Sequence, residues 1–167
     1  MIEFIPHLDI AYATTDLLVH PANGIGYMGG ADAVRQRMNS PTYHIQHASR
    51  GQIERMAQDV CRHKSPIGYA AGDFFITEAP NLKAKNVFHA VVTRFPWGAP
   101  KSHTLIQLCD ALLKFLDENP GKYNTIALPY LNKTGSKVTN DAMKYVYETR
   151  FADRPETFYI YEYQPEP

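Results

Sequence analysis

The stretch "HPANGIGYMGGADAVRQRM", from His20 to Met38, begins at the end of a short apolar run and leads into a segment with helical character. A strand followed by a glycine-rich turn and a helix is typical of α/β proteins, whose ligands favour the loops at the carboxyl ends of the strands. The glycines at positions 24, 26, 29 and 30 permit positive φ values and a close approach of the backbone to another group. The start of the following helix favours a bound phosphate through its free N–H groups. We therefore predict a phosphate-binding loop here.

Six short runs rich in aliphatic and aromatic residues are predicted to be strands. They are Ile2–Ile5, Asp16–His20, Asp73–Thr77, Asn86–Val92, Asn124–Pro129 and Thr157–Tyr163. Helices are predicted between them at residues 31–38, 51–63, 103–121 and 139–151, whereas residues 43–50 are interpreted as a loop. Strands that alternate with helices in this way favour a three-layer α/β/α sandwich with helices on both faces of the sheet.

Two of these helices carry expectations about their buried faces. The helix at residues 103–121 repeats apolar residues at helical spacing, which predicts a core face of Leu105, Leu108, Cys109, Leu112 and Leu116. The helix at residues 139–151 is expected to begin with Thr139 or Asn140 as its N-cap. Its expected buried residues are Ala142, Tyr145 and Val146.

The composition is that of an ordinary soluble globular domain. The chain has 167 residues, 44% of them hydrophobic, with 17 basic and 17 acidic side chains. A formal net charge of zero argues against nucleic acid as a partner, because no overall basic field attracts a phosphate backbone. Cys61 and Cys109 lie far apart, and we interpret them as reduced core thiols of a cytoplasmic protein. No apolar run is long enough to span a membrane, and no signal-peptide pattern is present.

The glycine-rich loop also has an alternative interpretation. Residues 24–29, "GIGYMG", match the G-x-G-x-x-G pattern of dinucleotide-binding loops in NAD-dependent oxidoreductases. That pattern requires an acidic residue about 20 positions later, at the end of a second strand. Here the corresponding region is interpreted as a loop that enters a helix, and Glu54 lies in the helical pattern. NADH binding distinguishes this alternative from the others.

A second loop of similar chemistry occurs later in the chain. Residues 132–137, "NKTGSK", follow a predicted strand and precede a predicted helix. They offer a carboxamide, two hydroxyls and backbone N–H groups. Two phosphate-binding loops at neighbouring strand ends would suit a diphosphate.

Taken together, these motifs resemble those of the macro domain family, which binds ADP-ribose. "DLLVHPANGIGYMGGADAV" (residues 16–34) resembles the family's first loop, and Asp9-Ile10 is similar to the segment before it. "IALPYLNKTGSK" (residues 126–137) resembles the diphosphate loop, and "TFYIYEY" (residues 157–163) resembles the last strand. The motifs follow the family's order along the whole chain. The resemblance implies a single macro domain over residues 1–167 with a mixed central sheet of about six strands.

The resemblance assigns binding roles to these segments. Asp9 and Ile10 are expected to bind adenine, with the Asp9 carboxylate taking the amino group, and Tyr163 is expected to pack beside the ring. The first loop is expected to contact the ligand through Gly24, Gly26, Met28, Gly29, Gly30 and Ala31. The diphosphate is expected to lie against Asn132, Lys133, Thr134, Gly135 and Ser136.

The resemblance also implies hydrolysis at C1'' of the distal ribose of an ADP-ribose derivative. Asn23 is expected to orient that ribose, and Asp32 to act as a general base. His20 replaces the first Asn of the usual N-x-A-N motif, and it is either an active-site acid or a structural histidine. The expected substrates are ADP-ribose 1''-phosphate, for a phosphatase, or an ADP-ribosylated protein, for a mono-ADP-ribosyl hydrolase.

No cofactor or metal ion is needed for that reaction. His44 and His47 form an H-x-x-H pattern, but no standard zinc-ligand spacing completes the set. Besides the oxidoreductase, two alternatives stay open. One is a reader that binds ADP-ribose without turning it over, and the other is an RNA-binding macro domain.

Overall fold

The structure is a computed structural model that describes residues 1–6, 9–36, 39–132 and 136–163. Its strands form one six-stranded sheet in the order β1-β6-β5-β2-β4-β3. Their bounds are β1 Ile2–Pro6, β2 Leu17–Asn23, β3 Phe74–Glu78, β4 Asn86–Thr93, β5 Thr125–Pro129 and β6 Thr157–Glu162. Neighbouring strands are parallel, except that β3 runs antiparallel to β4. The six predicted strands and the mixed sheet are confirmed, and β2 extends further than predicted, to Asn23.

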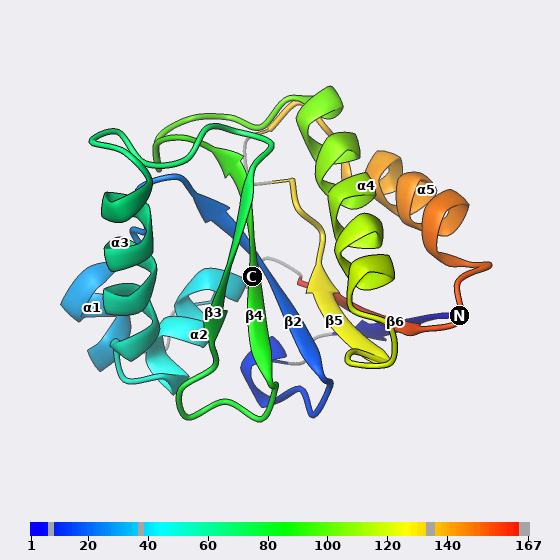
Figure 1. Cartoon of the computed structure of the whole chain (residues 1–167), viewed down its shortest axis with the longest axis horizontal. Coiled ribbons are helices and arrows are strands. Elements are labelled where there is room, and N and C mark those ends of the chain that lie inside the picture. Colours follow the sequence, from blue (N-terminus) through cyan, green and yellow to red (C-terminus); the bar gives the residue numbers. More distant parts are fainter. Residues whose placement is uncertain (7–8, 37–38, 133–135, 164–167) are drawn as a thin grey trace.

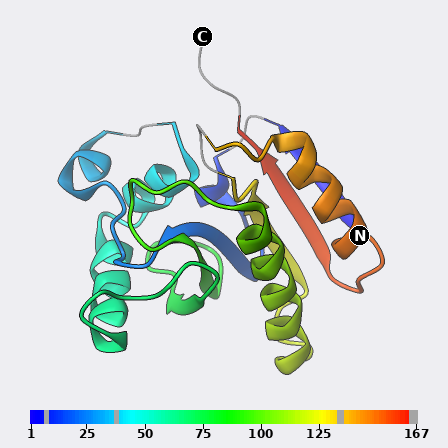
Figure 2. The same ribbon diagram turned by 90° about the horizontal axis from the view of Figure 1, so that it is seen from above.

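Helices cover both faces of this sheet, as Figures 1 and 2 show. One face carries α1 (Gly30–Arg35), α2 (Pro41–Ala48) and α3 (Gln52–Lys64). The other face carries α4 (Ser102–Glu118) and α5 (Asn140–Phe151). A short 3-10 helix, η1 (Ile10–Tyr12), follows β1 and contacts α2. The fold is therefore the predicted three-layer α/β/α sandwich.

Strand β2 is buried on both faces, which explains the apolar run at residues 17–19, and its buried polar residues His20 and Asn23 have hydrogen-bond partners. Leu17 and Val19 pack into the core beneath α4 and α5. Leu18, which points to the opposite face, packs with Ile45 of α2 and Ile53 of α3. The strand lies between β5 and β4 and is parallel to both. Its carboxyl end therefore delivers the glycine-rich loop to the middle of the sheet edge.

The predicted core face of α4 is confirmed, since the five residues predicted to form it are all buried. The predicted N-cap of α5 is confirmed as well. The side-chain oxygen of Thr139 accepts a hydrogen bond from the Ala142 N–H at 3.1 Å. The packing of α4 and the beginning of α5 thus follow the local sequence pattern.

The predicted buried face of α5 is wrong. Its buried residues are Met143, Tyr147 and Phe151, whereas Tyr145 is 69% exposed. Ala142 is also exposed, and Val146 is only half-buried. The Tyr147 hydroxyl donates to the Pro129 carbonyl at 2.7 Å and accepts from the Leu131 N–H. These contacts to the end of β5 select Tyr147 over Tyr145, which the helical spacing alone could not do.

Of the segment 43–50, interpreted above as a loop, residues 43–48 belong to α2. Ser40 caps the helix by accepting a hydrogen bond from the Tyr43 N–H, and Pro41 begins it. The helix buries two polar side chains, His44 and Gln46, beside Ile45. An apolar period is missing because the buried face is partly polar, with His44 bonded to Tyr163 and Gln46 bonded to Glu54.

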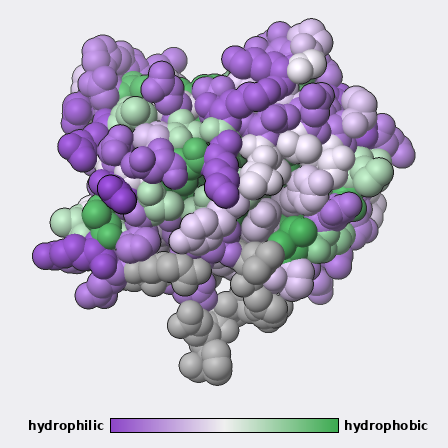
Figure 3. All heavy atoms as spheres, turned by 90° about the horizontal axis from the view of Figure 1, so that it is seen from below, coloured by the Kyte–Doolittle hydropathy of each residue, from purple (hydrophilic) through white to green (hydrophobic). Residues whose placement is uncertain are grey.

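Within the described part of the chain, no helix is both long enough and apolar enough to cross a bilayer. The face shown in Figure 3 is mostly hydrophilic, with hydrophobic residues scattered over it. Cys61 and Cys109 are buried free thiols, and burial raises the pKa of Cys61 to about 11 and that of Cys109 to about 12.

Candidate functional site

The carboxyl ends of the five parallel strands lie along one edge of the sheet. In sheet order, these ends lead to Asp9 after β1, Tyr163 after β6, Asn132 after β5, Asn23 at the end of β2 and Thr93 at the end of β4. Adjacent strands are about 4.8 Å apart, so the five ends span about 19 Å. The motifs singled out in the sequence are therefore brought together along one edge, where ligands of such sheets bind.

The first end of this edge holds a buried cluster around Asp9. Its carboxylate accepts a hydrogen bond from the Ala11 N–H at 2.8 Å, and its Oδ1 lies 3.2 Å from Nδ1 of His44. The Tyr163 hydroxyl accepts from the Ile10 N–H at 2.9 Å and lies 3.0 Å from the same His44 nitrogen. Asp9, Ile10 and Tyr163 are thus adjacent, as predicted. His44, considered above only as part of an H-x-x-H pattern, connects them to α2.

Asn23 shapes the first loop from within. Its Oδ1 accepts hydrogen bonds from the N–H groups of Ile25 and Tyr27, at 3.2 and 3.0 Å, and its Nδ2 donates to the Tyr27 carbonyl at 2.9 Å. Its side chain is buried. Among the described residues, these contacts use one of the two Nδ2 hydrogens, so the other can serve a ligand.

Three glycines of the loop lie so close to other protein atoms that a side chain would not fit there. A Cβ on Gly24 would lie 1.9 Å from the Tyr69 carbonyl oxygen, and one on Gly26 would lie 2.6 Å from the Gln58 backbone nitrogen. A Cβ on Gly29 would meet Ala33 and Tyr43 at 2.7 Å. Gly30 differs, because no atom lies within 4 Å of its would-be Cβ. Of these glycines, Gly30 is the one beside open space.

The loop is also held by a residue that sequence analysis did not assign to the site. Glu54 of α3 is buried, and its Oε2 accepts hydrogen bonds from the N–H groups of Met28 and Gly30. The Met28 side chain is fully buried in the core on the α2 and α3 side of the sheet. Two N–H groups expected to face a phosphate therefore face a carboxylate of the protein. The available signal was an acidic residue next to the buried stripe of α3.

His20 belongs to a buried hydrogen-bond network across the sheet. The Thr77 hydroxyl donates to the Glu78 carbonyl, so it accepts from Nε2 of His89 at 2.8 Å. Burial, with His20 nearby, lowers the pKa of His89 well below its usual value, so His89 is neutral and its Nδ1 accepts from Nδ1 of His20 at 3.0 Å. Nε2 of His20 lies 3.0 Å from the Thr42 hydroxyl. These contacts match the structural interpretation of His20.

Asp32 lies in the first turn of α1 with Ala31, and both are exposed. The Asp32 carboxylate is 79% exposed and bonds the Arg35 guanidinium at 2.7 Å. No hydrogen bond among the described residues joins Asp32, Asn23 and His20 to one another. The three predicted catalytic residues therefore share one loop region without forming a connected cluster.

The second loop is described only in part, because Lys133, Thr134 and Gly135 lie outside the described residues. Asn132 donates from Nδ2 to the Val138 carbonyl and to Oδ1 of Asn140, each at 2.9 Å. Ser136 accepts from the Val138 N–H and donates to the Pro100 carbonyl. Both flanks of the loop are thus tied to the start of α5 and to the loop before α4.

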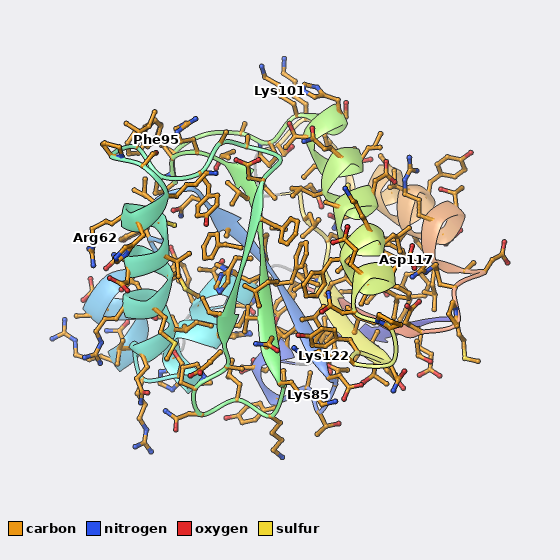
Figure 4. The ribbon with its side chains drawn as sticks, in the orientation of Figure 1. Arg62, Lys85, Phe95, Lys101, Asp117 and Lys122 are labelled. Carbon is orange, nitrogen blue, oxygen red and sulfur yellow. The ribbon has the colours of Figure 1, made fainter. Side chains whose placement is uncertain are left out.

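A cavity of about 380 Å³ opens at the end of β4, beside the first loop. Its lining includes three basic side chains, Arg94, Lys101 and His103, and no carboxylate. Trp97, 80% exposed, stacks on Phe95 with ring centroids 4.9 Å apart. In Figure 4, Phe95 and Lys101 lie at one end of the molecule, and Lys85 and Lys122 lie at the other. Thr93, which lines the cavity, is paired with Asn23 in the register between β4 and β2, so the cavity lies next to Asn23.

No set of three or more His, Cys, Asp or Glu side chains in the described part of the chain is arranged to hold a metal ion. His44 and His47 have separate partners, since His47 bonds the Val34 carbonyl at 2.8 Å and His44 belongs to the Asp9 cluster. The chemistry of this edge is that of hydrogen-bond donors, a few carboxylates and the basic cavity.

Several solved structures share this fold. The macrodomain of Mycobacterium tuberculosis DarG has 14% sequence identity, with 99% of both chains covered and a TM-score of 0.78. A mutant Oceanobacillus iheyensis macrodomain with ADPR has 17% identity, covering 98% of this chain and 85% of that one, with a TM-score of 0.72. Thermosipho africanus DarTG in complex with ADP-ribose has 11% identity, covering 99% of this chain and 43% of that one, with a TM-score of 0.76.

A search among curated proteins finds no match to this sequence. The sequence model of the family described as Macro domain, however, matches residues 19–142, which include the first loop, the basic cavity and the second loop. The match covers most of the chain and agrees with the architecture of the sheet and its helices. The chain therefore belongs to the macro domain family.

Proposed function

We propose that this macro domain binds ADP-ribose along the carboxyl edge of its sheet. The observation that carries the proposal is the order of the strand ends. Asp9 and Tyr163, the second loop, Asn23 and the basic cavity follow one another along about 19 Å. An extended ligand with an adenine, a diphosphate and a distal ribose meets these groups in that order. Two of the similar structures are described as complexes with ADPR or ADP-ribose.

The proposed adenine end is already organised. The Asp9 carboxylate is positioned by the Ala11 N–H and offers a charged acceptor for an amino group. The Ile10 N–H donates to the Tyr163 hydroxyl, so a ring that bonds this N–H displaces that hydroxyl. Because β1 pairs with β6, the two strands that build this end come from the two ends of the chain. We propose that residues 1–167 act as one domain.

The activity that we propose is hydrolysis at C1'' of the distal ribose. The free hydrogen of the Asn23 carboxamide orients the ribose, and Asp32, which is exposed beside the loop, activates water. His20 supports the end of β2 through His89 and Thr42. The basic lining of the cavity beside Asn23 favours an anionic leaving group, so ADP-ribose 1''-phosphate is the first substrate to test. A mono-ADP-ribosylated protein is the second.

A reader without turnover is the second candidate function, and the state of Asp32 favours it. A carboxylate that is exposed and paired with Arg35 has the environment of an ordinary surface residue, not that of an activated base. Binding requires only the adenine end and the loops. The RNA-binding alternative has less support, because the net charge is zero.

Calorimetry with ADP-ribose, AMP and NADH tests binding, and phosphate release from ADP-ribose 1''-phosphate tests turnover. We expect micromolar affinity for ADP-ribose, weaker binding of AMP, and NADH binding no tighter than that of AMP. Tight binding of NADH with little affinity for ADP-ribose would support the oxidoreductase instead. Tight binding of ADP-ribose with no release of phosphate and no removal of ADP-ribose from modified protein would support the second candidate, a reader without turnover.

A further inference from the structure

Glu54 is an acidic side chain buried without an ionic partner. No ion pair in the described part of the chain includes it, and it is 9% exposed. Burying a carboxylate is costly unless hydrogen bonds compensate for lost hydration. Glu54 receives three: from Met28 N–H and Gly30 N–H at Oε2, and from Gln46 Nε2 at Oε1, the last at 2.9 Å. All its hydrogen bonds therefore converge on the glycine loop and on α2.

These hydrogen bonds define the conformation of the loop where α1 begins. Gly29, the N-cap of α1, has a φ of 97° and provides no side-chain cap, and Gly30 has a φ of 62°. Glu54 replaces the missing cap, because it accepts the Gly30 N–H at the first position of the helix. Gln46 adds a second tether by donating to the Gly30 carbonyl at 3.3 Å.

The Gly29 N–H lies between the two that Glu54 takes. Among the described residues it has no hydrogen-bond acceptor, and the neighbouring Gly30 has open space beside its Cα. With Met28 and Gly30 bonded inward, the remaining N–H and the Gly30 face of the loop are left for a ligand. The geometry depends on the carboxylate behind the loop, not on the glycines alone.

We propose that Glu54 is a positioning residue for the distal part of the ligand. Its carboxylate sets the conformation of residues 28–30, and so places the Gly29 N–H and Asp32 relative to the distal ribose. The proposal rests on the proposed ADP-ribose binding. Asp9 and Tyr163 lie toward the other end of the edge and, within the described part of the chain, make no hydrogen bond to Glu54, which is linked to them only indirectly, through Gln46 and His44 of α2. We therefore expect the adenine end to depend on Glu54 less than the distal end does.

Glu54→Ala and Glu54→Gln test this proposal against Asp59→Asn as a matched control. Asp59 is an exposed carboxylate on the same helix, paired with His63 and without contact to the loop. We expect Glu54→Ala to weaken ADP-ribose binding about tenfold to a hundredfold while AMP affinity changes less than about twofold, because two charge-assisted hydrogen bonds are lost only at the distal end. Glu54→Gln keeps an acceptor for the two N–H groups, so we expect an intermediate loss. Asp59→Asn should bind both ligands as the wild type does.

Amide hydrogen exchange gives a second readout that needs no ligand. The N–H groups of Met28 and Gly30 should exchange slowly in the wild type and in Asp59→Asn, and should lose protection in Glu54→Ala. If Glu54→Ala does not fold, Glu54→Gln carries the same comparison. Equal weakening of AMP and ADP-ribose in a folded variant, or unchanged ADP-ribose binding with lost protection, would overturn the proposal. If the wild type binds neither ligand but its Met28 and Gly30 amides are protected, the proposed function is refuted, whereas the hydrogen bonds from these amides to Glu54 are supported.

Discussion

The buried pair of His20 and His89 predicts a loss of stability in mild acid. The His89 ring stacks on Phe75 at 4.5 Å and bonds Thr77, and burial lowers its pKa well below the usual value of 6.5. Below about pH 6.5 the unfolded chain therefore binds a proton that the folded chain does not bind. The free energy of unfolding then falls with falling pH by about 1.4 kcal/mol per pH unit, until the folded state also takes up the proton. From about pH 7 to about pH 5, this single group contributes a loss of about 2 kcal/mol.

His89→Gln removes the titration while retaining both kinds of contact. The carboxamide can accept from Nδ1 of His20 and donate to Thr77, so the variant should fold. Urea unfolding of wild type and variant near pH 7 and near pH 5 measures the difference. We expect the wild type to lose about 2 kcal/mol more than His89→Gln over this range. His63→Gln, at a 79% exposed position outside this network, is the control for replacing a histidine by glutamine. Equal losses in the wild type and His89→Gln would refute the assignment of a neutral His89.

Three further predictions concern the edge of the sheet. Asp9→Ala should weaken ADP-ribose binding about tenfold to a hundredfold in calorimetry, since one charge-assisted hydrogen bond is lost, and unchanged affinity would exclude Asp9 from adenine recognition. Asn23→Ala should lower the rate of phosphate release about a hundredfold with a smaller change in affinity, because the reacting carbon is misplaced, and an unchanged rate would contradict its role. Gly26→Ala should lower the free energy of unfolding by at least about 2 kcal/mol in urea titrations, because its Cβ meets the backbone of α3 and its φ of 80° disfavours alanine. Gly30→Ala, in open space, should cost only about 1 kcal/mol.

The strands could be predicted because their signal is local. A strand buried on both faces favours apolar residues, as β2 does at residues 17–19, and a short apolar run shows this directly. The core face of α4 could be predicted for the same reason, since a single apolar stripe repeats along it. α2 could not, because part of its buried face is polar. His44 and Gln46 form hydrogen bonds there with Tyr163 and Glu54, which lie elsewhere in the sequence.

The candidate site divides in the same way. Asp9, Asn23 and Tyr163 were predicted from motifs, and topology alone brings them to one edge, because parallel strands share the direction of their carboxyl ends. Glu54 could not be assigned from spacing. Its partners Met28 and Gly30 lie on a different element, and only the packing of α3 against the loop brings them within hydrogen-bond distance.

The glycine run therefore carries less functional information than its pattern indicates. Gly24, Gly26 and Gly29 are required because a Cβ at each would meet protein atoms, so they would be needed whether or not a ligand bound. Two of the loop N–H groups are taken by Glu54. A binding loop differs from a merely well-packed one in the groups that its own packing leaves unused. Here these groups are the space beside Gly30, the Gly29 N–H and the second hydrogen of Asn23. Similar glycine patterns in other α/β proteins indicate a bound phosphate only where N–H groups and open space stay available after the loop has packed against its own protein.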